Sequence, residues 1–301
     1  MKTTLVVFVL LFTTISLRAQ KIEVSGGKVV FYENFQSLYV DSRSVYVWLP
    51  ADYDLLKKYA VLYMHDGQML FDSTITWNKQ EWMVDETLGE LLREKKIKDV
   101  IVVGVANNGQ KRHAEYFPEK ALKYLKKAEA DSFISKFLYG KPQSDAYLSF
   151  LVKELKPFID GNFPTFSDQE NTFVAGSSMG GLISIYALCE YPDVFYGAAC
   201  LSTHWTGKYT ADNNPIPAAI SEYLTKNLPE PQSHKIYFDF GSETLDSLYK
   251  PYQIEVDKIL ISKGFSAKNW LTKEFPGDDH SERAWAGRLA VPLTFLLRKQ
   301  D

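Results

Sequence analysis

The sequence has few cysteines and no strong excess of charge of either sign. Only Cys189 and Cys200 occur among its 301 residues, so no disulfide framework supports the fold. We expect both to be small buried hydrophobic residues in adjacent core elements, with a disulfide between them as the alternative. The 34 basic and 37 acidic side chains give a formal net charge of −3, which argues against nucleic acid or an anionic membrane surface as the main partner.

Sequence patterns of metal and dinucleotide sites are missing too. No H-E-x-x-H, paired C-x-x-C or G-x-G-x-x-G pattern occurs in the chain. The five histidines are scattered along the sequence and share no metal-ligand spacing. We therefore expect neither a metal nor a cofactor.

A long apolar run occurs only at the N-terminus. Met1-Lys2 gives a positive start, residues 3–17 are apolar or carry hydroxyls, and a short polar stretch ends at Gln20. This layout is typical of a secretory signal peptide, and its apolar core is too short to span a bilayer. We expect residues 1–20 to be a signal peptide and the mature protein to be secreted or periplasmic, free of the membrane. A retained N-terminal anchor is the alternative.

In the remaining chain, short β-branched or apolar runs alternate with longer amphipathic runs. The predicted strands are 44–49, 60–64, 100–105, 172–175, 198–201, 236–240 and 270–275. The predicted helices lie near 80–95, 144–160, 179–190, 215–227, 248–263 and 282–299. Because strand and helix alternate in this way, we predict one α/β domain over 21–301, with a mostly parallel sheet and helices on both faces.

The segment 119–137 interrupts this alternation, because a short connection would suffice at its place. It is charged and helical in pattern. Its lysines are interrupted by Glu129 and Asp131, so a solvated helical face is favoured over a polyanion site. The segment could also form part of a cap over the functional site.

The stretch Gly176–Gly181 carries the clearest chemical signal in the sequence. It reads GSSMGG, follows a predicted buried strand and precedes a helical pattern. Strand, G-x-S-x-G and helix in this order predict a nucleophile elbow with Ser178 at its tip. The glycines are needed because side chains beside the strained turn would collide with neighbouring backbone. The N–H of Met179, at the start of the helix, is the expected first donor to a substrate oxyanion.

A serine nucleophile needs a general base, and His280 is the best candidate. It follows the last predicted strand, where a loop would bring the ring over the sheet edge beside Ser178. His234 precedes a strand instead, which puts it at the wrong end of the sheet. The acid that orients the base should follow the strand 236–240.

Three carboxylates compete for the role of the orienting acid. Asp246 and Glu243 both fit, and Asp239 would fit if the strand ended early. Asp246 could alternatively cap the helix that begins near Ser247, a common duty of aspartate. We prefer Asp246.

The second oxyanion donor should come from the loop after the strand 60–64. An N–H near Gly67 or Gln68 is expected there, and Gln68 is our choice, whereas His65 is expected to support the loop by packing. We also expect His204, Trp205 and Glu243 to line the substrate pocket, with core packing as the alternative for His204 and Trp205.

At these motifs the chain resembles the putative esterase family of α/β-hydrolases, which includes enterochelin, feruloyl and acetylxylan esterases. The matching pieces are Val61–Asp72, Arg112, Glu115-Tyr116, Pro118, Gly176–Gly181, Thr244–Tyr249, His280, Glu282, Trp285 and Arg288. The resemblance implies the α/β-hydrolase fold and ester hydrolysis with Ser178 and His280, and it favours Asp246 as the acid. The segment 119–137 differs widely among relatives, so the resemblance does not pass on a substrate.

These observations together predict a secreted serine esterase that acts through a Ser-His-Asp triad and an acyl-enzyme. The expected substrate is a small-molecule or glycan-linked ester, such as an acetyl or feruloyl ester of a polysaccharide. Two alternatives stay open: an esterase of enterochelin-type siderophores, and a hydrolase-fold binding module whose site is catalytically idle. The oligomeric state is not predictable from the sequence.

Overall fold

The computed structural model describes residues 22–299. The predicted signal peptide, residues 1–20, lies outside the described residues. Among residues 22–299, no helix is long and apolar enough to cross a membrane.

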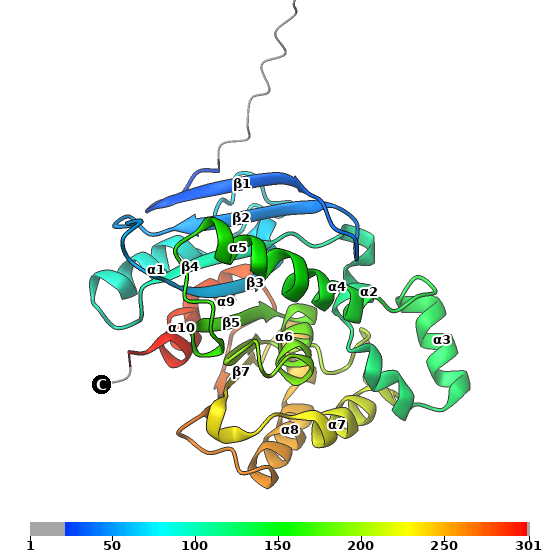
Figure 1. Ribbon diagram of the computed structural model, residues 1–301. Helices are drawn as coiled ribbons and strands as arrows, with labels where there is room; N and C mark the ends of the chain where they lie inside the picture. The colour runs from blue at the N-terminus through cyan, green and yellow to red at the C-terminus, as the bar shows by residue number, and fades with distance from the viewer. Residues whose placement is uncertain (1–21, 300–301) are drawn as a thin grey trace, which may run out of the picture.

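An eight-stranded sheet runs through the whole molecule (Figure 1). Its strand order is β1-β2-β4-β3-β5-β6-β7-β8. Strand β2 runs antiparallel to both of its neighbours, β1 and β4. The six strands from β4 to β8 in this order are parallel to one another. The strand bounds are β1 Lys28–Phe35, β2 Arg43–Leu49, β3 Ala60–His65, β4 Val100–Val105, β5 Thr172–Ser177, β6 Gly197–Leu201, β7 Lys235–Gly241 and β8 Trp270–Phe275. The carboxyl ends of the parallel strands therefore meet at one edge of the sheet.

Helices cover both faces of this sheet, as the alternating pattern predicts. Their bounds are α1 Val84–Arg93, α2 Arg112–Tyr116, α3 Lys127–Phe137, α4 Ser144–Phe150, α5 Lys156–Asn162, α6 Met179–Glu190, α7 Ile216–Asn227, α8 Lys250–Ser262, α9 Glu282–Arg288 and α10 Ala290–Leu297. Side chains of α2 to α8 form one core, and those of α1, α9 and α10 form the other. The α/β fold class is confirmed.

Strand β2 shows how one segment serves both cores. Val45, Val47 and Leu49 point into the core with α4 to α8, whereas Tyr46 and Trp48 point into the core with α1 and α10. Successive side chains of a strand leave opposite faces, so this alternation is what a two-sided sheet requires. The central strands β3 to β6 are buried along their whole length.

All seven predicted strands are present. The structure adds the strand β1 and the short helix α2, which the sequence pattern did not predict, and it alters two of the predicted helices. The sequence pattern did not predict β1, an edge strand whose side chains are exposed or half-buried. The helical stretch 144–162 contains a π turn at Leu151–Leu155, just before Pro157, which has no N–H to donate. The last predicted helix is two helices, because Pro292 cannot donate to the preceding turn.

The two cysteines are buried and free, Cys189 on α6 and Cys200 on β6. Burial raises the pKa of both thiols. They behave as the small hydrophobic residues that the sequence predicts, without a disulfide between them.

Candidate active site

Ser178 lies at the turn between β5 and α6, at the carboxyl edge of the sheet. Its backbone has φ 57° and ψ −120°, a strained conformation for a residue with a side chain. The turn is held from both sides, because the Ser178 N–H donates to the carbonyl of Leu201 at 2.9 Å and its carbonyl accepts from His204 N–H at 3.1 Å. The side chain remains half-buried and open to a ligand.

Glycines make this turn possible. A Cβ on Gly176 would lie 2.8 Å from the carbonyl carbon of Gly180, and one on Gly181 would lie 2.9 Å from the Thr203 hydroxyl. Neither position has room for a methyl group. The predicted strand, G-x-S-x-G and helix are therefore present in the order that an elbow requires.

His280 follows β8 and is hydrogen-bonded to a buried carboxylate. Its Nδ1 lies 2.5 Å from Oδ1 of Asp246, which sits on the 3₁₀ turn Thr244–Leu248 after β7. Thr244 fixes the His280 backbone, since its hydroxyl accepts from the His280 N–H at 2.9 Å. The ring of His280 packs edge-on against Trp285, with the ring centres 5.0 Å apart.

The second oxygen of Asp246 is also satisfied by hydrogen bonds. Oδ2 accepts from the N–H of Gly241 at 2.6 Å and from the hydroxyl of Ser202 at 2.6 Å. Burial raises the pKa of Asp246, but the hydrogen bond and charge of His280 and the bond from Ser202 outweigh it, so the pKa is lowered. The carboxylate is held ionised beside the imidazole.

The other two candidate acids occupy different places. Asp239 is buried on β7 and pairs with Arg288 at 3.1 Å and with the Tyr237 hydroxyl at 2.9 Å. Burial, opposed by Arg288, raises its pKa to about 6. Glu243 is exposed, and its carboxylate accepts from the Ser242 hydroxyl. Of the three carboxylates, Asp246 is the one hydrogen-bonded to His280.

The loop after β3 packs against the start of α6. Asp66 is in the left-handed region at φ 57°, and its carboxylate receives both Nε and Nη2 of Arg112 at 2.7 Å. A Cβ on Gly180 would lie 3.4 Å from this carboxylate, so the ion pair sits beside the elbow. Gln68, the predicted oxyanion donor, is on the same loop and half-buried, with its side-chain oxygen bound to Asn107 N–H at 3.2 Å.

His65 supports this loop from inside the core, as expected. Its Nδ1 lies 2.8 Å from the Tyr147 hydroxyl, and the residue is 1% exposed. Burial, with a smaller effect of Arg112, lowers the pKa of His65 to about 3, so the ring is neutral at physiological pH. His234 likewise packs away from the elbow, with its Nε2 3.0 Å from the carbonyl of Pro192.

Tyr249 links the serine turn to a second buried imidazole. Its hydroxyl lies 2.7 Å from Nδ1 of His204. Burial raises the pKa of Tyr249, and the nearby Ser178 side chain opposes this rise. The Tyr249 ring is 5.9 Å from that of His280. Burial, with smaller effects of His113 and His280, lowers the pKa of His204 well below its usual value. Tyr249 belongs to the matching piece Thr244–Tyr249, but no pattern in the sequence predicts a role for it.

A cavity of about 380 Å³ opens over Ser178. Met179 and His204 form part of its wall with Ser178. The remaining lining residues come from the turn before α2, from α2 itself, from the end of α3 and the residues after it, and from the loop after β6: Gly109, Gln110, Arg112, His113, Lys136, Phe137, Tyr139 and Tyr209.

The predicted pocket residues divide into three outcomes. His204 lines this cavity. Trp205 does not, because it is 2% exposed, packs against Phe238 and donates its indole N–H to Gln253, so core packing is the correct alternative. Glu243 belongs to a separate hollow beside Arg288 and does not line the cavity at Ser178.

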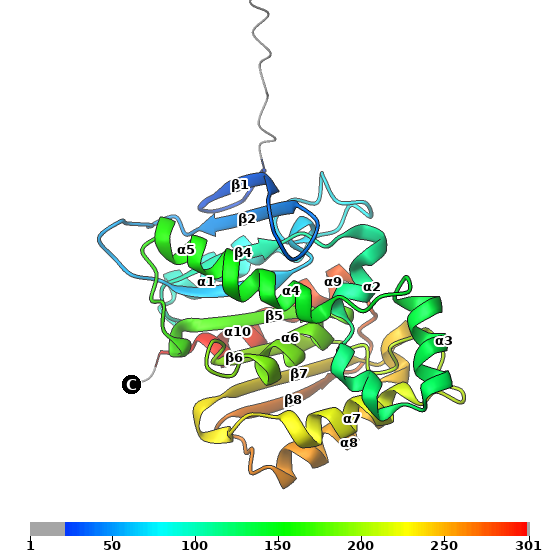
Figure 2. The same cartoon turned by 45° about the vertical axis from the view of Figure 1, so that its right-hand side comes forward.

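The segment 119–137 folds as a 3₁₀ turn over Glu119–Tyr124 followed by α3, which stands beyond the sheet edge (Figure 2). Lys136 and Phe137 at the end of α3, with Tyr139 just after it, form one side of the cavity. Phe133 and Phe137 pack on the ring of His113, with ring centres 6.0 Å apart in each pair. The segment therefore borders the site instead of being only a solvated face.

Comparison with known proteins identifies the family. The family described as "Putative esterase" matches residues 38–293. The chain belongs to this family. It is therefore a carboxylic ester hydrolase.

Two relatives from Bacillus subtilis align with part of the chain. A Bacillus subtilis (strain 168) protein called YjcH is 28% identical over 156 residues, which cover 52% of this chain and 53% of that protein. A second protein of the same organism, YbbA, is 23% identical over 203 residues, covering 67% of this chain and 69% of YbbA. The esterase thus aligns with only about half the length of YjcH.

Solved structures show the same fold. A ferulic acid esterase from Anaeromyces mucronatus, in complex with ferulic acid, has a TM-score of 0.62 and 19% identity, covering 93% of each chain. The enterochelin esterase of Shigella flexneri has a TM-score of 0.64 and 16% identity, covering 92% of this esterase and 59% of that chain. At identities this low, the similarity shows a shared α/β-hydrolase fold but does not indicate a shared substrate.

Proposed function

We propose that this esterase works through Ser178, His280 and Asp246. His280 removes the proton of the Ser178 hydroxyl, whose oxygen attacks the ester carbonyl carbon. The C–O bond to the alcohol breaks, and the alcohol leaves with the proton from His280. Water, deprotonated by His280, then attacks the acyl-enzyme and releases the acid and free Ser178.

The single observation that carries this proposal is the 2.5 Å contact between His280 Nδ1 and Asp246 Oδ1, made at the carboxyl edge where the strained Ser178 also lies. An ionised acid on Nδ1 leaves Nε2 to act as the base. The first helical N–H of α6, at Met179, has no acceptor within the helix and suits a developing oxyanion. An N–H at Gln68 is proposed as the second donor.

For the substrate, we propose an ester of a phenolic acid, with a feruloyl ester as the first candidate. Phe137, Tyr139 and Tyr209 provide aromatic surface at the cavity, and the latter two are exposed at its mouth. Lys136 adds a positive charge at the same wall. That charge also suits the anionic dihydroxybenzoyl group of a siderophore ester, which is the second candidate.

Labelling with a fluorophosphonate probe tests the catalytic proposal. Wild-type protein should be labelled, and both Ser178→Ala and His280→Ala should lose labelling while keeping their melting temperatures within a few degrees. A folded wild-type protein that stays unlabelled would instead favour an idle site. Rates on methyl ferulate, p-nitrophenyl acetate and a dihydroxybenzoyl-serine ester then separate the substrate candidates.

We further propose that the enzyme is exported, because residues 1–20 have the layout of a signal peptide. N-terminal sequencing of protein recovered from outside the cytoplasm should begin near Gln20 or Lys21. An intact Met1 on that protein would support the retained anchor.

A further inference from the structure

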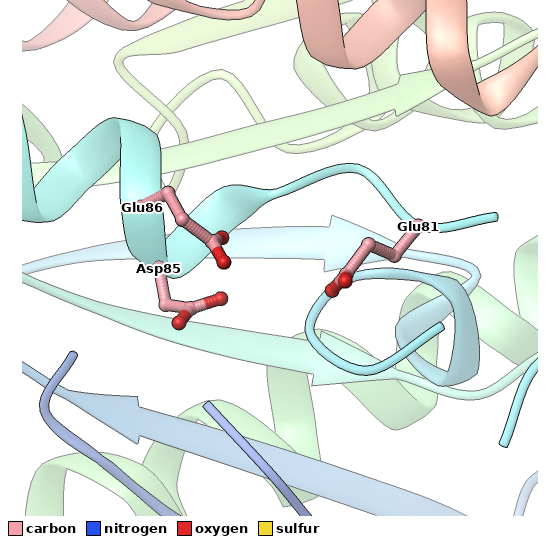
Figure 3. Close-up of side chains that lie close together, drawn as sticks. All are labelled: Glu81, Asp85 and Glu86. Carbon is pink, nitrogen blue, oxygen red and sulfur yellow. The ribbon is translucent and has the colours of Figure 1, made fainter. Parts of the chain in front are cut away.

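Three carboxylates gather at the start of α1, outside the site built on Ser178. Asp85 and Glu86 belong to the first turn of the helix, and Glu81 lies in the loop just before it. One oxygen from each residue lies within 4.8 Å of the other two. Figure 3 shows the three carboxylate groups turned toward one another across a small gap.

Each of these carboxylates keeps one buried oxygen that has no hydrogen-bond partner among residues 22–299. The atoms are Oε2 of Glu81, Oδ1 of Asp85 and Oε2 of Glu86. Asp85 is 0% exposed, yet only its Oδ2 is satisfied, by the N–H of Ser25 at 2.6 Å and of Gly26 at 3.3 Å. The Ser25 hydroxyl likewise donates to the other oxygen of Glu86. Asp85 and Glu86 therefore each have one oxygen that accepts hydrogen bonds and one that has no donor within residues 22–299.

The cluster also lacks the cationic partner that other buried acids of this enzyme have. Glu115 pairs with Arg43, Asp66 with Arg112 and Asp239 with Arg288. Within residues 22–299, no lysine or arginine forms an ion pair with Glu81, Asp85 or Glu86. Unpaired buried charges are costly, and like charges this close add repulsion. Either a bound cation or a proton shared between two of the carboxylates neutralises them.

We propose that Glu81, Asp85 and Glu86 form a binding site for a hard divalent cation, with Ca²⁺ as the first candidate. Carboxylate oxygens are the preferred ligands of such ions, and the cluster contains no histidine or cysteine that would select zinc. Oxygens this far apart can each reach a shared ion at roughly 2.4 Å. Ca²⁺ accepts irregular geometry with water as additional ligands, whereas Mg²⁺ demands a regular, tighter octahedron.

A cation at this position would connect the N-terminal segment at Ser25 and the loop before α1 to the first turn of α1. Asp85 already holds the backbone at Ser25 and Gly26. Glu81 belongs to the loop 72–83. In this loop Asn78 donates to the Glu282 carboxylate at 2.8 Å, and Glu282 lies two residues after His280 in the sequence. The ion is therefore a structural one, and its binding should raise the stability of the whole fold.

Thermal unfolding with added cations tests the site. After chelator treatment, millimolar Ca²⁺ should raise the melting temperature of the full-length protein by about 5 °C, as expected for a ligand well above its Kd. Mg²⁺ at the same concentration should raise it less, and K⁺ at matched ionic strength should have no effect. Tb³⁺ should give luminescence sensitised by the neighbouring Trp82, and Ca²⁺ should displace it.

The variants make the site assignment specific. Asp85→Asn and, independently, Glu81→Gln should abolish both the Ca²⁺-dependent shift and the Tb³⁺ signal. Glu90→Gln, an exposed residue of the same helix with the same change of charge, should keep both. An unchanged wild-type melting temperature in Ca²⁺ overturns the proposal and leaves a shared proton as the neutraliser. Equal loss in Glu90→Gln would also overturn it, by showing diffuse surface binding.

Discussion

At the scale of single residues, the hydrogen-bond partners of the buried carboxylates near the elbow show which of them can orient His280. The sequence alone leaves that choice open. Asp239, Glu243 and Asp246 lie within eight consecutive positions, Asp239 inside β7 and the other two just after it. Which of them meets His280 depends on the 3₁₀ turn after β7, where Thr244 adopts φ 52°. Such a turn leaves no periodic signal in a sequence, so no pattern could have chosen between them.

Replacing the proposed acid should separate it from its neighbour. Asp246→Asn should lower kcat/KM for p-nitrophenyl acetate by about 10³- to 10⁴-fold, because an amide favours the wrong imidazole tautomer. Glu243→Gln, the matched control, should keep activity within about twofold, since its carboxylate contacts Ser242 and not His280. The reverse ranking would assign the acid role to Glu243.

Buried histidines should make the enzyme sensitive to mild acid. Burial lowers the pKa of His65 to about 3 and that of His113 to about 4, whereas both are near 6.5 when unfolded. The unfolded state therefore binds more protons as pH falls, so stability is fully present above pH 6.5 and is lost progressively below it. Urea unfolding at pH 8, 7 and 5 measures this loss.

His65→Phe tests the contribution of that residue to acid sensitivity. The variant cannot be protonated at this position, so the fall in unfolding free energy between pH 7 and 5 should be smaller than in the wild type. Between pH 8 and 7 the two proteins should change alike. An identical loss below pH 6.5 in both would show that His65 does not titrate on unfolding.

At the scale of elements, apolar runs long enough to be buried on both sides predicted the central strands closely. Strands β3 to β6 are shielded from water along their length, so their sequences contain little but apolar residues. Strand β1 escaped prediction because an edge position allows Glu33 and Asn34 within it. Lys136 and Tyr209 were missed as cavity residues because helix α3 and the loop after β6 reach the site only through tertiary packing.

The glycines of the elbow should tolerate no side chain. Gly176→Ala brings a methyl group to 2.8 Å from the backbone of Gly180 and should destabilise the fold by about 2 kcal/mol. Gly89→Ala, in helix α1 with nothing within 4 Å of the new Cβ, should instead stabilise it by about 0.5–1 kcal/mol. Chemical denaturation of the two variants measures both, and equal effects would contradict the packing argument.

Helix α3 should influence substrate choice without touching the bond that breaks. Lys136→Gln should raise KM for a dihydroxybenzoyl or ferulate ester about tenfold while leaving p-nitrophenyl acetate nearly unchanged, because only the larger acids reach this wall. Lys127→Gln is the control, since that residue lies on the same helix but pairs with Asp131 at the surface. A parallel loss on all three esters would point to a folding defect.

At the scale of the whole molecule, one sheet connects the two cores. Strand β2 contributes to both, and the same strands that carry Ser178 and Asp246 hold the helices of either face. The alternating pattern was sufficient to predict this architecture, because a parallel sheet requires crossovers that cover both faces. The sequence pattern does not predict the substrate, because substrate choice depends on a few side chains that line the cavity.

Shared strands predict cooperative unfolding. Calorimetry of the purified protein should show a single transition whose van't Hoff and calorimetric enthalpies agree, because neither core can persist without the sheet. Two resolved transitions would mean that part of the molecule unfolds independently of the rest. The measurement is meaningful only where refolding on cooling is reversible.

The order of the proposed active residues along the chain has a consequence during biosynthesis. Ser178 leaves the ribosome about a hundred residues ahead of His280, and the contact that holds Asp246 against the imidazole forms only after β7 and β8 are complete. A nascent or prematurely terminated chain would carry the elbow sequence without its base. Catalytic activity would therefore appear late in synthesis, and any measured turnover would come from chains translated at least as far as His280.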